Sequence, residues 1–346
     1  MSKTLQDYAT LINDTIQSNE INHYITTDNM CQNLGGIDTF KNINIPQGKV
    51  RSFQKDDVLL SNIRLYFRKV YRAKQKGGCS SDVLVFRAKH IDSATLFAIL
   101  SSQIFTDYAC SGSQGSKMPR GNKTHMMDFK IPTINFTIAK IFNSIQNKIE
   151  NNHKINELLH TLAYKIYEYY FKYKPKNAKL EQIIIENPKS NIMVKNAQKT
   201  QDKYPFFTSG DNILSYPKAI IDGRNCFLNT GGNAGIKFYV GKASYSTHTW
   251  CICANEFSDY LYLLLSSIKN HINQSFFQGT NLKHLQKNLL KKYPIYMPSA
   301  HEIKKFNQII IPLLTLISIN TRTSKKLEQI RDFLLPLLLK QQVKPK

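Results

Sequence analysis

The chain has 346 residues, 42% of them hydrophobic, which allows two folded domains and excludes a disordered polypeptide. It contains no run of about 18 uncharged apolar residues and no signal-peptide pattern, so a cytoplasmic protein with no membrane partner is expected. Its 47 lysines and arginines exceed its 24 acidic residues and give a net charge of +23, which favours a polyanion partner, above all nucleic acid.

The segment 1–133 has the pattern of a mixed α/β domain. A β-branched run at Val83–Phe86 predicts a strand among glycine and asparagine turns, and a helix is expected over 91–103. Two stretches suit DNA. The first is a basic run with interleaved aromatic residues, in which the candidate DNA-binding residues are Arg64, Tyr66, Arg68, Lys69 and Arg72. The second is a polar loop able to approach a groove, with the candidates Gln114, Lys117 and Arg120.

Residues 134–173 carry apolar side chains in alternating steps of four and three, which is typical of the seam of a coiled coil. A helix of about forty residues, about 60 Å long, is therefore predicted. Its seam positions are Ile138, Phe142, Ile145, Ile149, Asn152, Asn156, Leu159, Ala163, Ile166 and Tyr170. Asn152 is a polar seam residue of the kind that fixes the register of a coiled coil.

A second mixed α/β region is expected over 174–298, after a short hinge at Lys174–Ala178. The run Ile236–Val240 predicts a strand, and a helix is expected over 256–273. Basic and amide side chains near glycine-containing turns are again candidates for contact with DNA. They are Lys237, Lys242, Gln278, Asn281 and Lys283.

Residues 299–342 repeat the coiled-coil pattern, and every seam position lies at the same offset from its counterpart as Phe306 does from Ile138. The positions are Phe306, Ile310, Leu313, Ile317, Asn320, Ser324, Leu327, Arg331, Leu334 and Leu338. Pro312 and Pro336 fall inside this pattern, so a kink, or a break near Pro336, is expected.

The chain as a whole is predicted to be a tandem duplication. The motif at Leu96–Ser102 recurs at Leu261–Ser267, and the shared seams extend the repeat. If the two helices pair, they must run antiparallel, with Asn152 and Asn320 facing each other and the two α/β regions at opposite ends. Such a molecule would touch two short DNA sites separated by a gap. The simpler alternative is two amphipathic helices, each packed on its own domain.

No catalytic motif is recognised, so no catalytic residue, metal or cofactor is predicted. The segment Gly235–Ala243 differs from a phosphate-binding loop in its spacing and lacks the hydroxyl residue of that loop. The chain contains no Pro-Pro pair, which the motif of adenine methylases requires. Glu302–Lys304 resembles the end of a nuclease motif, but no matching upstream aspartate stands out. The six cysteines lack C-x-x-C spacing, and Cys251 and Cys253 are predicted to be reduced thiols on one strand.

Several motifs resemble those of type I restriction–modification DNA specificity subunits. Tyr24–Met30 looks like the opening motif of the family, and Asp57–Tyr66 resembles a second motif, with Leu65 where the family often has proline. Asn152–Leu162 and Leu327–Pro336 resemble the two characteristic helical regions of the family. The resemblance covers nearly the whole chain, and the helical motifs are its specific part.

The resemblance implies two α/β target recognition domains, over 1–133 and 174–298, each of which reads one half of a split DNA site. They would be joined by a pair of long antiparallel coiled-coil helices over 134–173 and 299–342. It further implies a non-enzymatic subunit that binds double-stranded DNA and docks two methyltransferase subunits, with restriction subunits joining when cleavage occurs. Two alternatives stay open: the specificity subunit of a type II system whose partner fuses methylase and nuclease, and a coiled-coil scaffold.

Overall fold

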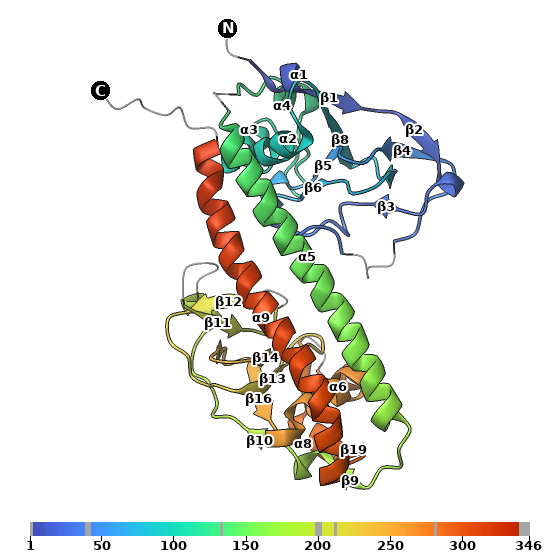
Figure 1. The fold of residues 1–346 in the computed structure, drawn as a ribbon, viewed down its shortest axis with the longest axis vertical. Coiled ribbons are helices and arrows are strands. Elements are labelled where there is room, and N and C mark those ends of the chain that lie inside the picture. Colours follow the sequence, from blue (N-terminus) through green and yellow to red (C-terminus); the bar gives the residue numbers. More distant parts are fainter. Residues whose placement is uncertain are drawn as a thin grey trace. The chain divides into compact units, whose positions relative to one another are not determined.

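A computed structural model describes residues 3–38, 43–131, 134–197, 203–210, 213–279 and 282–338. These residues form two compact units (Figure 1). Unit 1 consists of the chain up to Glu150 together with the chain from Leu327 onward, and unit 2 is Asn151–Lys326. Each unit therefore contains one α/β region and a segment of each long helix. Within the described residues, no helix is both long and apolar enough to cross a membrane.

Unit 1 is built on a four-stranded antiparallel sheet in the order β1-β8-β5-β6. Its strands are β1 (Ala9–Ile12), β8 (Val83–Ala88), β5 (Val58–Ser61) and β6 (Val70–Arg72). A second sheet, in the order β2-β4-β7-β3, contains β2 (Thr15–Gln17), β4 (Lys49–Phe53), β7 (Gly77–Cys79) and β3 (Tyr24–Ile25). The helices of the α/β region are α1 (Leu5–Tyr8), α2 (Ser93–Leu100), α3 (Gln103–Ser111) and α4 (Lys123–Met127).

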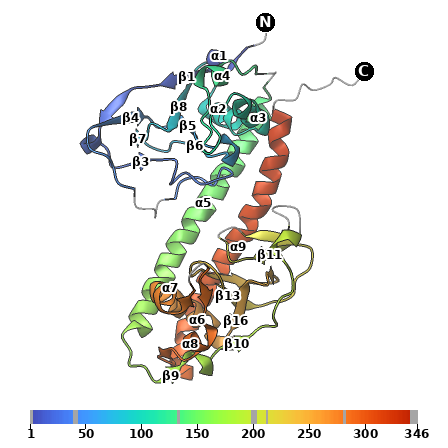
Figure 2. The same cartoon turned by 180° about the vertical axis from the view of Figure 1, so that it is seen from behind.

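Unit 2 repeats the main sheet in the order β10-β16-β13-β14. Its strands are β10 (Ile185–Glu186), β16 (Thr249–Cys253), β13 (Arg224–Asn229) and β14 (Ile236–Val240). The shorter strands are β9 (Ala178–Lys179), β11 (Tyr204–Phe207), β12 (Leu214–Tyr216), β15 (Ser244–Tyr245), β17 (Phe277–Gln278), β18 (His284–Leu285) and β19 (Pro294–Ile295). Its short helices are α6 (Ser258–Ser267), α7 (Lys269–Ser275) and α8 (Lys287–Lys291), and Figure 2 shows α6 beside the sheet.

The two units share one architecture. In both, the third strand of the main sheet leads through a hairpin to the fourth, and two helices follow the second strand along the chain. The strands predicted at Val83–Phe86 and Ile236–Val240 are present. The helices expected over 91–103 and 256–273 are each divided in two. Ser102 caps a new helix by accepting from Phe105 N, and α6 ends at Ser267, with Ile268 as its C-cap.

The two long helices are α5 (Phe136–Tyr167), which continues into a π-helical turn at Glu168–Lys172, and α9 (Ala300–Leu338). All twenty predicted seam residues are buried or half-buried. The break expected near Pro336 is absent from the described part of α9. A proline removes only one backbone hydrogen bond, and buried Leu335 and Leu338 hold this last turn against the core of unit 1.

Within unit 2 the two helices pair in antiparallel fashion through a polar step in the seam. Asn152 Nδ2 donates to Ser324 Oγ at 3.1 Å, and Asn320 Nδ2 donates to Asn156 Oδ1 at 3.0 Å. The prediction that Asn152 and Asn320 face each other is therefore wrong. In an antiparallel pair, the first polar position of one helix meets the second polar position of the other. The mixed α/β class is confirmed.

Each unit also packs its long-helix segments against its own α/β region. In unit 1, Phe97 of α2 lies 5.6 Å from Phe142 of α5, measured between ring centroids, and Figure 1 shows α2 and α3 beside the start of α5. In unit 2, Phe171, in the π-helical turn that follows α5, packs edge-on against Tyr260 of α6, with the ring centroids 5.2 Å apart. Aromatic side chains at helical spacing thus join helix and α/β region into one core in each unit.

Candidate nucleic-acid interface

Two loops of unit 1 lie side by side at one end of the main sheet. The first connects β5 to β6, and the second connects α3 to α4. Arg64 N donates to Pro119 O at 2.9 Å, and Gly121 N donates to Asn62 O at 3.1 Å. An isolated β-bridge joins Ile63 to Arg120. We call this pair of loops, residues 62–68 and 113–121, edge 1.

Edge 1 brings together five of the predicted DNA-binding residues. Arg64 Nη2 donates to Lys117 O at 3.3 Å, and Gln114 forms a β-bridge with Arg120. Tyr66, Gln114 and Lys117 are exposed. The Arg120 side chain is 62% exposed and lies 3.0 Å from the carboxylate of Asp82. Cationic and amide donors therefore stand on one accessible surface, as contact with phosphates and base edges requires.

The rest of the basic run is directed into the unit. Arg68 Nη2 donates to Ser101 O at 2.9 Å, and burial lowers the pKa of its guanidinium. Lys69 Nζ donates to Thr27 O at 2.5 Å. The Arg72 side chain is only 15% exposed and lies 3.8 Å from Asp56. Arg68 and Lys69 therefore lie behind edge 1, and Arg72 lies at the other end of the hairpin, where it pairs with Val58. None of the three stands on the surface of edge 1.

The backbone of edge 1 is held in an uncommon conformation. Arg64 and Arg68 have φ values of 50° and 49°, in the left-handed region that non-glycine residues seldom adopt. Each such residue costs about 1 kcal/mol or more. Cross-loop hydrogen bonds such as Arg64 N to Pro119 O offset this cost and fix the turn Leu65–Phe67 that presents Tyr66.

Unit 2 contains the same pair of loops. Gly231 forms a β-bridge with His284, and Gln278 pairs with His284 in register. Gly232 N donates to Lys283 O at 2.9 Å, and Leu285 N donates to Thr230 O at 3.1 Å. We call the described residues of these loops, 230–235, 278–279 and 282–285, edge 2.

Two predicted residues of unit 2 stand on edge 2, and Lys237 and Lys242 do not. Gln278 and Lys283 are exposed there, whereas Asn281 lies outside the described residues. Lys237 Nζ donates to Thr208 O at 2.8 Å and Gly210 O at 2.6 Å, behind the edge. Lys242 is exposed at the opposite end of β14, where it lines a groove with Lys218 and Tyr204.

The comparison of the two edges adds residues that the sequence reasoning missed. Asp82, which pairs with Arg120, and His284 were not among the candidates. A signal for His284 was present in the sequence, because the offset from Arg120 to His284 equals the offset from Gln114 to Gln278. Applying the repeat spacing to every candidate would have found it.

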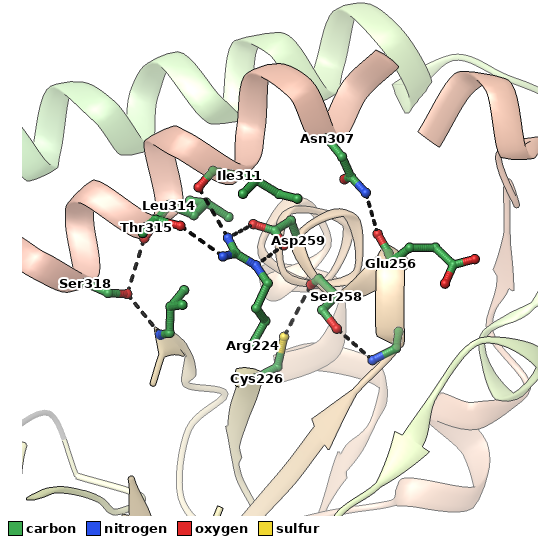
Figure 3. Close-up of polar contacts among 12 residues, drawn as sticks. Arg224, Cys226, Glu256, Ser258, Asp259, Asn307, Ile311, Leu314, Thr315 and Ser318 are labelled. Atoms are coloured by element: carbon green, nitrogen blue, oxygen red, sulfur yellow. Dashed lines mark hydrogen bonds and ion pairs between the residues drawn. The ribbon is translucent and has the colours of Figure 1, made fainter. Parts of the chain in front are cut away.

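A buried ion pair fixes the sheet of unit 2 to α9 (Figure 3). Arg224 of β13 makes two hydrogen bonds to the carboxylate of Asp259 on α6, one of them from Nε at 2.5 Å. Its Nη1 donates to Thr315 Oγ1 of α9 at 2.9 Å. Burial raises the pKa of Asp259, and the bidentate pairing with Arg224 acts against that rise. Val240 N donates to Ser318 Oγ at 3.0 Å, so β14 is fixed to the same helix.

The start of α9 is stabilised by Glu302, the residue that resembled part of a nuclease motif. Glu302 accepts from Ser299 N at 2.9 Å and from Tyr296 Oη at 2.8 Å, and its own N–H donates to Ser299 Oγ at 3.3 Å. This is a capping box, which places the carboxylate at the helix N-terminus. The hydrogen bond from Ser299 N holds the pKa of Glu302 down to about 2. Among the described residues, no group of three or more histidine, cysteine, aspartate or glutamate side chains could hold a metal ion.

The fold is similar to that of a solved structure, the S subunit of a type I restriction–modification system from M. genitalium, with a TM-score of 0.65, 14% identity, and coverage of 99% of this chain and 96% of that chain. The HsdS subunit from Thermoanaerobacter tengcongensis aligns over 98% of this chain and 96% of that chain, with 13% identity and a TM-score of 0.37. No curated protein matches the sequence.

A family model gives the assignment for the second half of the chain. Residues 176–329 match the model of the family described as "Type I restriction modification DNA specificity domain". The family recognised from the sequence motifs is the one that this model describes.

Proposed function

We propose that the chain is the DNA-binding specificity subunit of a type I restriction–modification complex and that each unit reads one half of a bipartite site. One observation carries this proposal: edges 1 and 2 have the same loop pair, joined by the same β-bridges. A protein with a single binding task has no need of two copies of one loop pair. These two sites carry the functional conclusion, because a fold alone does not define a function.

The charge and chemistry of the edges support this proposal. The net charge of +23 provides the general attraction to the phosphate backbone, which supplies affinity without sequence preference. Exposed glutamine, lysine, arginine and tyrosine side chains on the edges supply the donors and acceptors that distinguish bases. In the proposed organisation, 1–133 and 174–298 are the target recognition domains, and 134–173 and 299–342 are the coiled-coil helices between them.

The outer faces of the long helices support docking of methyltransferase subunits. In unit 2, α5 exposes Ile155, Leu158 and Leu162, of which Leu158 is 59% exposed. On α9 the exposed apolar residues include Leu316 and Ile319. A soluble helix that exposes apolar residues at helical spacing favours association with another helix. We propose that two methyltransferase subunits dock here and that restriction subunits join the complex for cleavage.

The chain itself is proposed to act without catalysis. The titratable groups described above hold the fold together: Glu302 caps α9, Asp259 pairs with Arg224, and Asp82 pairs with Arg120. Burial also raises the pKa of the Cys79 thiol to about 12, which makes it a poor nucleophile. The chain supplies recognition, and the methyl transfer and cleavage belong to its partners.

Methylome sequencing tests the proposed function. A host without other methylases would express the chain together with its cognate methyltransferase. The expected result is a single methylated motif made of two short sequence blocks separated by an unread gap. Expression of the methyltransferase alone is the control and should leave the genome unmodified at that motif. A continuous motif, or the same motif without this chain, would refute the proposal.

A further inference from the structure

The two edges have the same geometry but different chemistry at one pair of positions. In edge 1, Arg120 forms β-bridges with both Ile63 and Gln114. In edge 2, the residue that bridges to both Gly231 and Gln278 is His284. His284 therefore occupies in unit 2 the position that Arg120 occupies in unit 1. Both side chains are exposed.

The partner position changes in parallel. Asn62 N donates to Asp82 O at 2.7 Å in unit 1, and Thr230 N donates to His248 O at 3.2 Å in unit 2. Each acceptor directly precedes the strand that pairs with the third strand of its sheet. His248 is thus the counterpart of Asp82 and is also exposed. An arginine–aspartate pair on edge 1 corresponds to two histidines on edge 2.

This exchange changes what the position can recognise. The guanidinium of Arg120 has only donors, and the carboxylate of Asp82, 3.0 Å away, orients it. Such a donor fork suits the two acceptors of guanine in the major groove. A neutral imidazole offers one donor and one acceptor, so it suits a base edge that offers both. The imidazole of His284 lies beside Gly231, which has no side chain to crowd it. A Cβ built on this glycine would lie 3.9 Å from Nδ1 of His284, and edge 1 has Ile63 at the corresponding position.

We propose that His284 is a specificity-determining residue for one half of the DNA site, in the position that Arg120 holds for the other half. The inference rests on the proposed function and deepens it by naming a base-reading residue. His248 is its positioning neighbour, as Asp82 is for Arg120. The two halves of the site therefore differ at the base pair that these equivalent positions contact.

The test uses the methylome of a host that expresses the full chain with its cognate methyltransferase. Three variants are compared with the natural chain. His284→Ala removes the proposed contact. The double change His284→Arg with His248→Asp rebuilds the ion pair of edge 1 on edge 2. His301→Ala, at an exposed position on α9, is the matched control for loss of a histidine.

With His284→Ala, discrimination at one position in one block of the motif should fall by about fivefold or more, while the other block is unchanged. The double variant should restore discrimination at that position with a preference for guanine, which also shows that the altered edge still folds. His301→Ala should leave both blocks unchanged. If the natural chain directs a bipartite motif and both edge-2 variants retain it unaltered, the inference is overturned while the proposed function stands. If the natural chain directs no bipartite motif, the proposed function fails, and this inference fails with it.

Discussion

The exposed cations of edge 1 allow a quantitative test of DNA contact. Lys117 and Arg120 stand on the surface of the edge, and the guanidinium of Arg120 pairs with the carboxylate of Asp82 at 3.0 Å. Replacing both with alanine removes two cations and one surface ion pair. Since exposed ion pairs contribute about 0–1 kcal/mol to stability, the fold should survive the change.

The expected loss follows from counterion release. Each phosphate contact contributes about 0.9 to the slope of log K against log salt concentration. On a duplex of arbitrary sequence, which lacks the base that Arg120 is proposed to read, both Lys117 and Arg120 are expected to contact phosphates, so the slope should fall by about 1.8. At about 0.15 M salt this corresponds to about a 30-fold loss of affinity, or about 2 kcal/mol. The assay is fluorescence anisotropy of a labelled duplex of arbitrary sequence, titrated with the full chain at several salt concentrations.

The matched control removes two cations from the other end of the same hairpin. Lys55 and Lys76 are exposed in turns near the start of β5 and the end of β6, where Asp56 N donates to Ala73 O at 2.8 Å. Their double alanine variant has the same net charge as the Lys117 and Arg120 variant, and its slope should stay within about 0.5 of the natural value if those turns face away from DNA. An equal fall in both variants would refute the placement of DNA on edge 1.

Three further predictions concern the residues that hold the fold together. Glu302→Gln should lower the unfolding free energy by about 1 kcal/mol at neutral pH, because it weakens the cap of α9. The pKa of Glu302 is held at about 2, below its usual 4.5. The difference in unfolding free energy between the natural chain and the variant should therefore be complete above pH 4.5 and vanish as the pH falls toward 2. A difference in urea unfolding that stays constant down to pH 2 would contradict this prediction. Asn152→Leu combined with Ser324→Ala should raise the unfolding free energy by about 1 kcal/mol or more, because Asn152 Oδ1 is buried and has no hydrogen-bond partner among the described residues. Asn152→Asp should lower the unfolding free energy. A double variant less stable than Asn152→Asp would refute this reasoning. Arg224→Ala should cost about 3 kcal/mol in thermal or urea unfolding because it leaves buried Asp259 without its cation, and Arg224→Met with Asp259→Leu should recover most of that loss.

Features set by periodicity were predicted from the sequence. The alternating four-and-three steps place every seam residue on an inner face, and the β-branched runs are strands. The break expected near Pro336 and the direct pairing of Asn152 with Asn320 were wrong. Both depend on the neighbouring helix or core, which local patterns do not specify.

The binding surface was predicted less completely, because it depends on contacts between distant residues. The composition of the basic run suggested one surface, but Arg68 bonds to Ser101 and Lys69 bonds to Thr27. Whether a lysine or arginine side chain faces solvent is decided by carbonyl acceptors far away along the chain. His284 was missed for a different reason: a single histidine in a loop carries no local signal. Its position follows from the repeat offset that relates Gln114 to Gln278, and its bridges to Gly231 and Gln278 agree with that offset.

The crossed polar step of the seam has a consequence for the divergence and recombination of such genes. Asn152 contacts Ser324, and Asn156 contacts Asn320. A substitution on one helix is therefore compensated at the residue that it contacts on the other helix, and not at the residue that corresponds to it in the repeat. Correlated substitutions among homologues should therefore link 152 with 324 and 156 with 320. A single crossover within 174–298 joins the first helix of one parent to the second helix of the other and mixes both pairs. A double crossover inside that region exchanges the recognition sequence and leaves both pairs matched, so it is the exchange that selection should tolerate.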